Sequence, residues 1–149
     1  MDTLAESMDL VGHLLASERL AVLSTQYGGQ PYSNLIAFAY TDNLKYLIFV
    51  TSRNTRKYGN VLADKRVAVL VDSRKHDTSD FKGAMAITAL GTAEEGTGSE
   101  REELLRVYLA KHPHLEGFAN NRSSALIKIS ISDYIIARFD SVRSLHIGD

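Results

Sequence analysis

The stretch YSNLIAFAYTDNLKYLIFVTSRNTRKYGN, residues 32–60, contains two apolar runs, a short polar break between them and a basic segment at its end. The runs at 32–40 and 45–51 are rich in aromatic and branched apolar residues, which favours β-strands. The break TDN has the length of a hairpin connection, so we expect the two strands to pair antiparallel. The chain therefore builds a sheet through a local turn here.

The remaining apolar runs extend this pattern along the whole chain. Most of them are separated by turn-like segments rather than by long helical crossovers, which favours an antiparallel barrel with helices packed outside over a parallel sheet. We therefore expect one mainly β domain spanning residues 1–149. The further strands expected are Leu20–Thr25, Val67–Asp72, Ala84–Glu95, Ala125–Ile131 and Tyr134–Phe139.

Three segments have the apolar spacing of amphipathic helices. Two of them begin with the pattern of a capping box, in which a hydroxyl and a glutamate three residues later bond to each other's backbone. The two boxes are Thr3 with Glu6 and Ser99 with Glu102. The expected helices span residues 3–17, Asn54 or Thr55 to about Asp64, and Ser99 to the residues before Pro113.

The composition is that of an ordinary globular protein and excludes several functional classes. Of 149 residues, 44% are hydrophobic and 23% charged, and the net charge of −1 argues against a general electrostatic attraction to nucleic acid or anionic lipid. The absence of cysteine excludes disulfides and thiolate chemistry. No apolar run approaches the roughly 20 residues of a membrane helix, and no signal-peptide pattern is present. We expect a soluble cytoplasmic protein without nucleic-acid or membrane partners.

The basic segment after the second strand is the strongest candidate for a binding site. A helix N-terminus presents free backbone N–H groups and the positive end of the helix dipole. Thr51, Ser52 and Thr55 add hydroxyls, and Arg56 and Lys57 add positive charge. A phosphate dianion is bound by this combination of short donors and cations. From the residues alone, a solvated basic helix start remains the commoner explanation.

The order of five motifs along the chain points beyond this local pattern. They are GQPYSN (29–34), LIFVTSRNTRK (47–57), NVLADKRVAVLVDSR (60–74), MAITALGTAEE (85–95) and YLAKHPHLEGF (108–118). This order resembles the pyridoxamine 5'-phosphate oxidase-like FMN-binding split-barrel family over about residues 8 to 140. The resemblance implies a split β-barrel of antiparallel Greek-key type with helices outside. It also reverses the preference for a solvated helix start at the basic segment.

The resemblance implies where FMN would bind. In this family the junction between the third strand and the following helix holds the FMN phosphate, which corresponds here to residues 50–57. The polar part of the second strand would run beside the isoalloxazine ring, and the loop after the fourth strand would approach the cofactor. The FMN-binding residues implied are Ser33, Asn34, Leu35, Val50, Thr51, Ser52, Thr55, Arg56, Lys57 and Asp72.

The resemblance also implies a homodimer with FMN in the interface clefts, and an FMN-dependent oxidoreductase that is flavin reductase-like or related to pyridoxamine phosphate oxidase. NAD(P)H would be a possible electron donor. True pyridoxamine phosphate oxidases have arginine where this chain has Asn34, and an Arg-Gln pair where it has Met85 and Ala86. We therefore do not expect vitamin B6 oxidation, and we assign no catalytic or metal-binding residue.

Two alternatives remain open within the same fold. One is a non-catalytic FMN carrier, and the other is a protein that binds haem or a deazaflavin. A haem protein would need a histidine ligand, and no surrounding motif singles out one of the five histidines. These are His13, His76, His112, His114 and His146.

Overall fold

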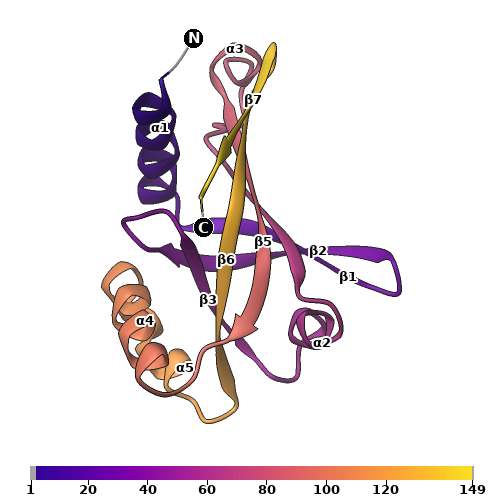
Figure 1. The fold of residues 1–149 in the computed structure, drawn as a ribbon, viewed down its shortest axis with the longest axis vertical. Coiled ribbons are helices and arrows are strands. Elements are labelled where there is room, and N and C mark those ends of the chain that lie inside the picture. The colour runs from indigo at the N-terminus through magenta and orange to yellow at the C-terminus, as the bar shows by residue number, and fades with distance from the viewer. Residues whose placement is uncertain (1–2, 149) are drawn as a thin grey trace.

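A single seven-stranded antiparallel sheet dominates the computed structural model, which describes residues 3–148 (Figure 1). Residues 1, 2 and 149 of the expected domain lie outside the described residues. The strands are β1 (Leu20–Tyr27), β2 (Gln30–Tyr40), β3 (Tyr46–Ser52), β4 (Arg66–Asp72), β5 (Met85–Glu95), β6 (Ser124–Arg138) and β7 (Ser141–His146).

The sheet closes on itself to form a barrel. Its strand order is β3-β2-β1-β4-β5-β6-β7, and an additional pairing of β3 with β6 joins the first six strands into a ring. Strands β1 to β3 form a meander and β4 returns beside β1, which is the Greek-key order. The mainly β, antiparallel Greek-key barrel predicted from the sequence is therefore confirmed.

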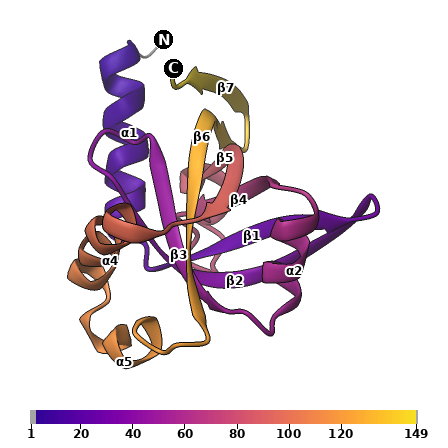
Figure 2. The same cartoon turned by 60° about the horizontal axis from the view of Figure 1, so that its bottom comes forward.

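The helices lie outside the barrel wall and at its ends (Figures 1 and 2). At the first helix the predicted capping box is confirmed, because the Glu6 amide donates to Thr3 Oγ1 at 3.1 Å and the Thr3 amide donates to Glu6 Oε2 at 3.3 Å. The helices are α1 (Leu4–Ser17), α2 (Arg56–Ala63), α3 (Asp80–Gly83), α4 (Gly98–Lys111), the 3-10 turn η1 (Pro113–Leu115) and α5 (Glu116–Ala119).

The second predicted capping box is wrong. Helix α4 begins at Gly98, whose φ of 61° is in the left-handed region that glycine adopts without strain. Ser99 consequently lies inside the first turn, where its hydroxyl is not at the capping position. Thr97 occupies that position and makes no side-chain cap hydrogen bond. The end of the helix before Pro113 is as predicted.

Two apolar clusters hold the elements together. The interior of the barrel is filled by strand residues together with the buried faces of α1 and α2, including Val11, Leu15 and Val61. The second cluster lies on the outer face of β2, β3 and β6, where α4 and α5 cover the wall. Its buried members are Ala39, Ile48, Val50, Leu104, Leu105, Tyr108, Ala119 and Leu126.

The last part of the chain differs from the sequence prediction. One continuous strand, β6, replaces the two expected at 125–131 and 134–139, because a register shift between Leu90 and Gly91 of β5 accommodates the extra residue. A Cβ at Gly91 would meet the backbone oxygen of Ser130, so the close approach requires glycine. Strand β7 was not predicted, since Leu145 is its only buried residue and the apolar alternation is weak.

The barrel wall splits between β2 and β3. Their ladder has three residue pairs, from Phe38 with Phe49 to Tyr40 with Leu47. Beyond this point β3 continues along β6, whereas residues 30–37 of β2 pair only with β1. The Tyr108 hydroxyl donates to the Ala37 carbonyl at 3.3 Å where the two strands separate. Residues 30–37 therefore have one edge without a partner strand.

The β1–β2 hairpin extends past the barrel wall, and α2 lies against it (Figures 1 and 2). Only Val22, Leu23 and Ser24 of β1 pair with β4, so the outer half of the hairpin has no neighbouring strand. Asn60 Nδ2 of α2 donates to Thr25 Oγ1 at 3.0 Å, and this hydrogen bond is buried. The hairpin and the helix consequently form the two walls of a hollow.

None of the helices between residues 3 and 148 combines the length and the apolar character needed to cross a bilayer.

Lys111 at the end of α4 makes the stability of the fold dependent on pH. Its ammonium donates to the Leu15 carbonyl at 2.8 Å and lies 3.8 Å from the ring centroid of Phe38. It has no ion pair with any residue of the described range, and burial lowers the pKa of Lys111 from 10.5 to about 8. The folded state therefore holds this proton less tightly than the unfolded state.

We expect the free energy of unfolding to rise as the pH is raised from about 7.5 to about 9.5, because the unfolded chain binds more protons in this window. Urea denaturation at the two pH values measures the change. Lys111→Met should remove most of the rise, since it keeps the side-chain stem and deletes the buried charge. An equal rise in the variant would show that other groups cause it.

Candidate cofactor site

The junction between β3 and α2 is built by two threonine hydroxyls. Thr51 is 1% exposed, and its Oγ1 lies 2.9 Å from Oγ1 of Thr55, the N-cap residue of α2. The Thr55 hydroxyl donates to the Ser52 carbonyl at 2.9 Å and accepts from the Tyr58 amide at 3.3 Å. Both hydroxyl hydrogens are thus used within the junction. Thr51 and Thr55 shape the turn that exposes the helix N-terminus.

Arg56 and Lys57 are the first two residues of α2 and provide its positive charge. The Arg56 guanidinium lies 4.9 Å from the ring centroid of Tyr32 on the hairpin. Lys57 is half-buried, and this burial lowers the pKa of Lys57. Neither cation has a carboxylate partner among residues 3–148. An anion placed at this helix end would therefore meet two uncompensated cations and the free N–H groups of the first turn.

Arg53, the third cation of the segment, has a structural role. It forms an ion pair with Glu95 and donates from Nη1 to the carbonyls of Arg122 and Ser124, each at 3.0 Å. Glu95 also accepts from the Tyr58 hydroxyl at 2.8 Å. This network fixes the junction to β5 and to the start of β6. Arg53 is consequently occupied, whereas Arg56 and Lys57 are free to bind a ligand.

The β2 residues expected beside the ring divide between the two faces of the strand. Ser33 Oγ lies 3.0 Å from Ser24 Oγ on the outer face, and Leu35, on the same face, is 65% exposed. Asn34 has the same orientation as buried Ile36. Its Oδ1 is buried without a hydrogen-bond partner among the described residues. A buried acceptor in this condition is rare and fits a site that a donor from a ligand completes.

A hollow of about 530 Å³ lies beside the helix N-terminus, between the hairpin and α2. It contains one of the predicted phosphate-binding residues, Arg56. Of the other lining residues, Asn60 lies within the helix expected from the sequence, and the hairpin residues precede or begin the strand expected at 32–40. No local signal marks them as a site. The lining residues are Tyr27, Gln30, Pro31, Tyr32, Arg56 and Asn60.

Asp72 lies away from this group of residues. Asp72 is the last residue of β4, and the first residue of that strand, Arg66, follows α2. The two ends of a seven-residue strand lie about 20 Å apart. The Asp72 carboxylate pairs with Arg74 at 2.9 Å and lines a different hollow, of about 320 Å³, together with Met85 and Ala86. Within one chain, Asp72 therefore does not meet the residues at the start of α2.

A row of partly exposed, mainly apolar side chains crosses the outer face of the sheet. Five adjacent strands contribute one residue each, and each of these residues is paired in register with the one on the next strand. The residues of this row belong to neither of the two buried apolar clusters, whereas the face under α4 and α5 forms the second of those clusters. We call this set the apolar row, and it consists of Leu35, Val22, Leu70, Thr88 and Ile135.

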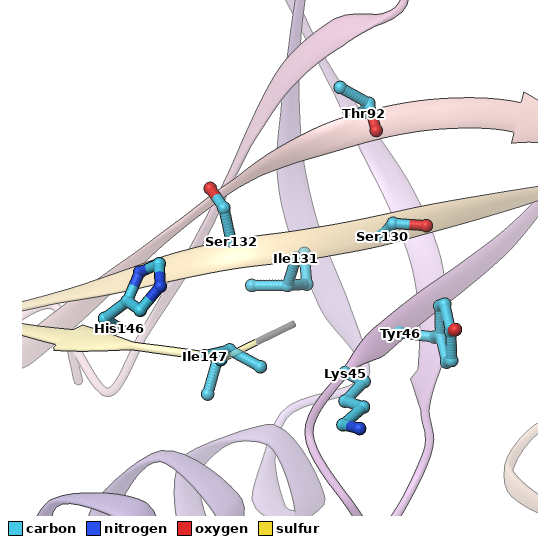
Figure 3. A pocket seen from close by; sticks show the side chains of 9 residues that line it. Lys45, Tyr46, Thr92, Ser130, Ile131, Ser132, His146 and Ile147 are labelled. Carbon is cyan, nitrogen blue, oxygen red and sulfur yellow. The ribbon is translucent and has the colours of Figure 1, made fainter.

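Another hollow, of about 560 Å³, opens where β3 and β7 both leave β6, and it contains none of the predicted FMN-binding residues. Figure 3 shows Ile131 and Ile147 near its middle, with His146 at one end and Tyr46 at the other. His146 Nδ1 donates to Asp133 Oδ1 at 2.9 Å, and this bond holds the pKa of Asp133 below its usual value.

A family model described as pyridoxamine 5'-phosphate oxidase matches residues 9–135 of the chain. No curated protein matches this chain.

Several solved structures share the fold at low sequence identity. A haem-binding protein from Mycobacterium smegmatis superposes with a TM-score of 0.84 at 13% identity, covering 98% of this chain and 59% of that protein. This chain thus spans about three fifths of the mycobacterial protein. An FAD-binding protein from Mesorhizobium loti has a TM-score of 0.65 at 21% identity, covering 93% and 90% of the two chains.

A protein described as a putative pyridoxamine 5'-phosphate oxidase from Listeria innocua has a TM-score of 0.67 at 18% identity, covering 94% of this chain and 98% of its own. At these identities the likenesses establish the fold alone.

Proposed function

Because this chain belongs to the pyridoxamine 5'-phosphate oxidase family, we propose that it is a flavoprotein that binds FMN beside the start of α2 and transfers electrons through it. The observation that carries the proposal is the pair of uncompensated cations, Arg56 and Lys57, at the N-terminus of α2, where the Arg56 guanidinium lies over Tyr32 of β2. We call Arg56, Lys57 and the first turn of α2 the phosphate clamp.

The residues present fit a flavin mononucleotide. The phosphate clamp supplies two cations and backbone N–H groups for the phosphate. The orphaned Asn34 Oδ1 is an acceptor for a hydroxyl or an imide N–H of the cofactor. The unpaired edge of residues 30–37 offers backbone groups to the rim of a flat ring. Thr51 and Thr55 hold the junction in the shape that exposes these groups.

The bound flavin would supply hydride and electron transfer, and the protein would bind, orient and partly desolvate it. Asn34, Met85 and Ala86 replace the residues that vitamin B6 oxidases use, and Met85 and Ala86 line a mostly apolar hollow. We therefore propose a less specialised cytoplasmic oxidoreductase that accepts electrons from a nicotinamide donor. We assign no acid or base, since no described side chain beside the clamp requires that role.

We also propose that two chains associate through the apolar row. An uncovered face of this kind on a soluble protein marks an interaction surface. The row continues across five strands from Leu35 on β2 to Ile135 on β6, and in an isologous contact the same patch of two copies would meet. The same association would bring Asp72 of one chain towards the cofactor of the other, which the single chain does not achieve.

We expect the purified protein to bind FMN, and the bound flavin to be bleached by NADH or NADPH without oxygen. Anaerobic absorbance titration of the FMN-loaded protein measures both events. Flavin binding without bleaching by either donor would favour a non-catalytic FMN carrier. Binding of a deazaflavin without binding of FMN would contradict the assignment of FMN as the cofactor. Binding of no flavin at all would overturn the proposed function.

Haem binding is a second candidate, supported by His146. A carboxylate that accepts from one imidazole nitrogen fixes the tautomer and leaves the other nitrogen free to ligate a metal, which is the arrangement of Asp133 and His146. The likeness to the mycobacterial haem-binding protein supports the same candidate. A haem Soret band that His146→Ala removes and His13→Ala retains would favour it over the flavin.

A further inference from the structure

We propose that the hollow between the β1–β2 hairpin and α2 is a subsite for an adenosine group, next to the phosphate that the clamp holds. The inference rests on the proposed phosphate clamp and extends it. Arg56 belongs to both, so a ligand whose phosphate lies on the clamp can continue directly into the hollow. FMN ends at its phosphate, and a dinucleotide does not.

The hollow has flat groups of the kind that stack on a nucleobase. Tyr27 is 67% exposed at the hairpin tip, and Tyr32 is half-buried on the next strand. The Arg56 guanidinium already lies over the Tyr32 ring at 4.9 Å. Aromatic rings and guanidinium planes are the surfaces on which proteins stack bases. An isolated exposed tyrosine would not indicate a site, but two beside a phosphate-binding arginine do.

The walls of the hollow are held together at two points. Asn60 Nδ2 on α2 donates to Thr25 Oγ1 at 3.0 Å, and Gln26 Nε2 donates to Asp64 Oδ2 at the end of the helix. Gln26 Oε1 in turn accepts from the Gly29 amide at 2.8 Å, which fixes the tip of the hairpin. The hollow is therefore preformed, and a ligand entering it does not need to order a loop.

Polar groups at the floor and rim suit a base with an amino group. The hydrogen bond from Asn60 Nδ2 orients that amide and leaves its Oδ1 as an acceptor. Gln30 provides a second amide at the rim. The volume of about 530 Å³ lies within the range of about 300–1,000 Å³ typical of ligand pockets. The geometry points to the adenylate of either FAD or the nicotinamide donor.

Isothermal titration calorimetry of the flavin-free full-length protein with FMN, FAD and 5'-AMP tests the inference. If the adenylate is that of FAD, FAD should bind at least tenfold more tightly than FMN. Tyr27→Leu, which leaves the Arg56–Tyr32 contact in place, should reduce this ratio to about one and change FMN affinity less than about twofold. Tyr46→Leu, in the separate hollow where β3 and β7 leave β6, is the matched control and should leave the ratio of FAD to FMN affinity unchanged.

The adenylate of the nicotinamide donor predicts a different set of affinities. If the adenylate is that of the nicotinamide donor, FAD and FMN should bind equally, 5'-AMP should bind the FMN-loaded protein, and Tyr27→Leu should abolish AMP binding. Tight FMN binding with neither an FAD advantage nor AMP binding overturns the subsite and leaves the proposed function intact. Failure of every flavin to bind overturns the proposed function, and Tyr27-dependent AMP binding would then still support the subsite.

Discussion

FMN affinity is expected to fall at least tenfold, and by about 100-fold if both cations contact the phosphate, when Arg56 and Lys57 are replaced together by alanine. Each charge-assisted hydrogen bond contributes about 1.5–3 kcal/mol, and about 1.4 kcal/mol corresponds to a tenfold change in affinity. Because the two side chains have no carboxylate partner among residues 3–148, their loss should leave the fold intact. Fluorescence titration with FMN measures the change.

The matched control removes two cations elsewhere. Arg106 on α4 and Arg122 before β6 are exposed, and their joint replacement by alanine changes the net charge by the same amount. This variant should keep the FMN affinity of the parent protein. If the Arg56–Lys57 double variant is folded and binds FMN as tightly as the control, the phosphate clamp is misplaced.

Leu70→Arg is expected to separate the proposed dimer, with an increase of at least about 100-fold in its dissociation constant, equivalent to about 2.7 kcal/mol. Leu70 is half-buried at the centre of the apolar row, between Val22 and Thr88. In an isologous interface the substitution places an arginine from each copy in an apolar contact, which is strongly unfavourable. Sedimentation equilibrium measures the change in association.

The control for this variant is Leu4→Arg, which places the same charge on a leucine of α1 that is 65% exposed and lies outside the apolar row. It should leave the association unchanged. Leu70→Arg should also weaken FMN binding if the second chain completes the site. A parent protein that is monomeric at micromolar concentration would contradict the dimer, whatever the variants do.

The sequence predicts most of the fold because successive strands pair through local turns. It predicts both halves of β6 but not their continuity, because the cause lies in another strand: the missing side chain of Gly91 lets β5 and β6 shift register, and β6 continues without a break. Strand β7 has one buried residue, Leu145, and its pairing with β6 carries no amphipathic signal.

The position of the candidate site follows from the order of motifs, but the roles of its residues do not. Arg53 is indistinguishable from Arg56 in the sequence, and only the fold brings Glu95, 42 positions away, to its guanidinium. Tyr27 begins YGGQP (27–31), whose glycines and proline predict a turn, and Tyr32 begins the strand expected at 32–40. Their common hollow exists because α2 packs against a hairpin that ends 16 positions before the helix begins.

The unpaired edge of β2 has a consequence for handling the protein. A strand edge with free N–H and C=O groups is a template for edge-to-edge association with other chains. Pro31, which lacks an N–H, lies at the outer end of this edge and weakens the template there. Residues 32–37 have no such protection. A ligand that covers this edge would therefore act as a solubilising factor, and depleting it would favour aggregation at unchanged net charge.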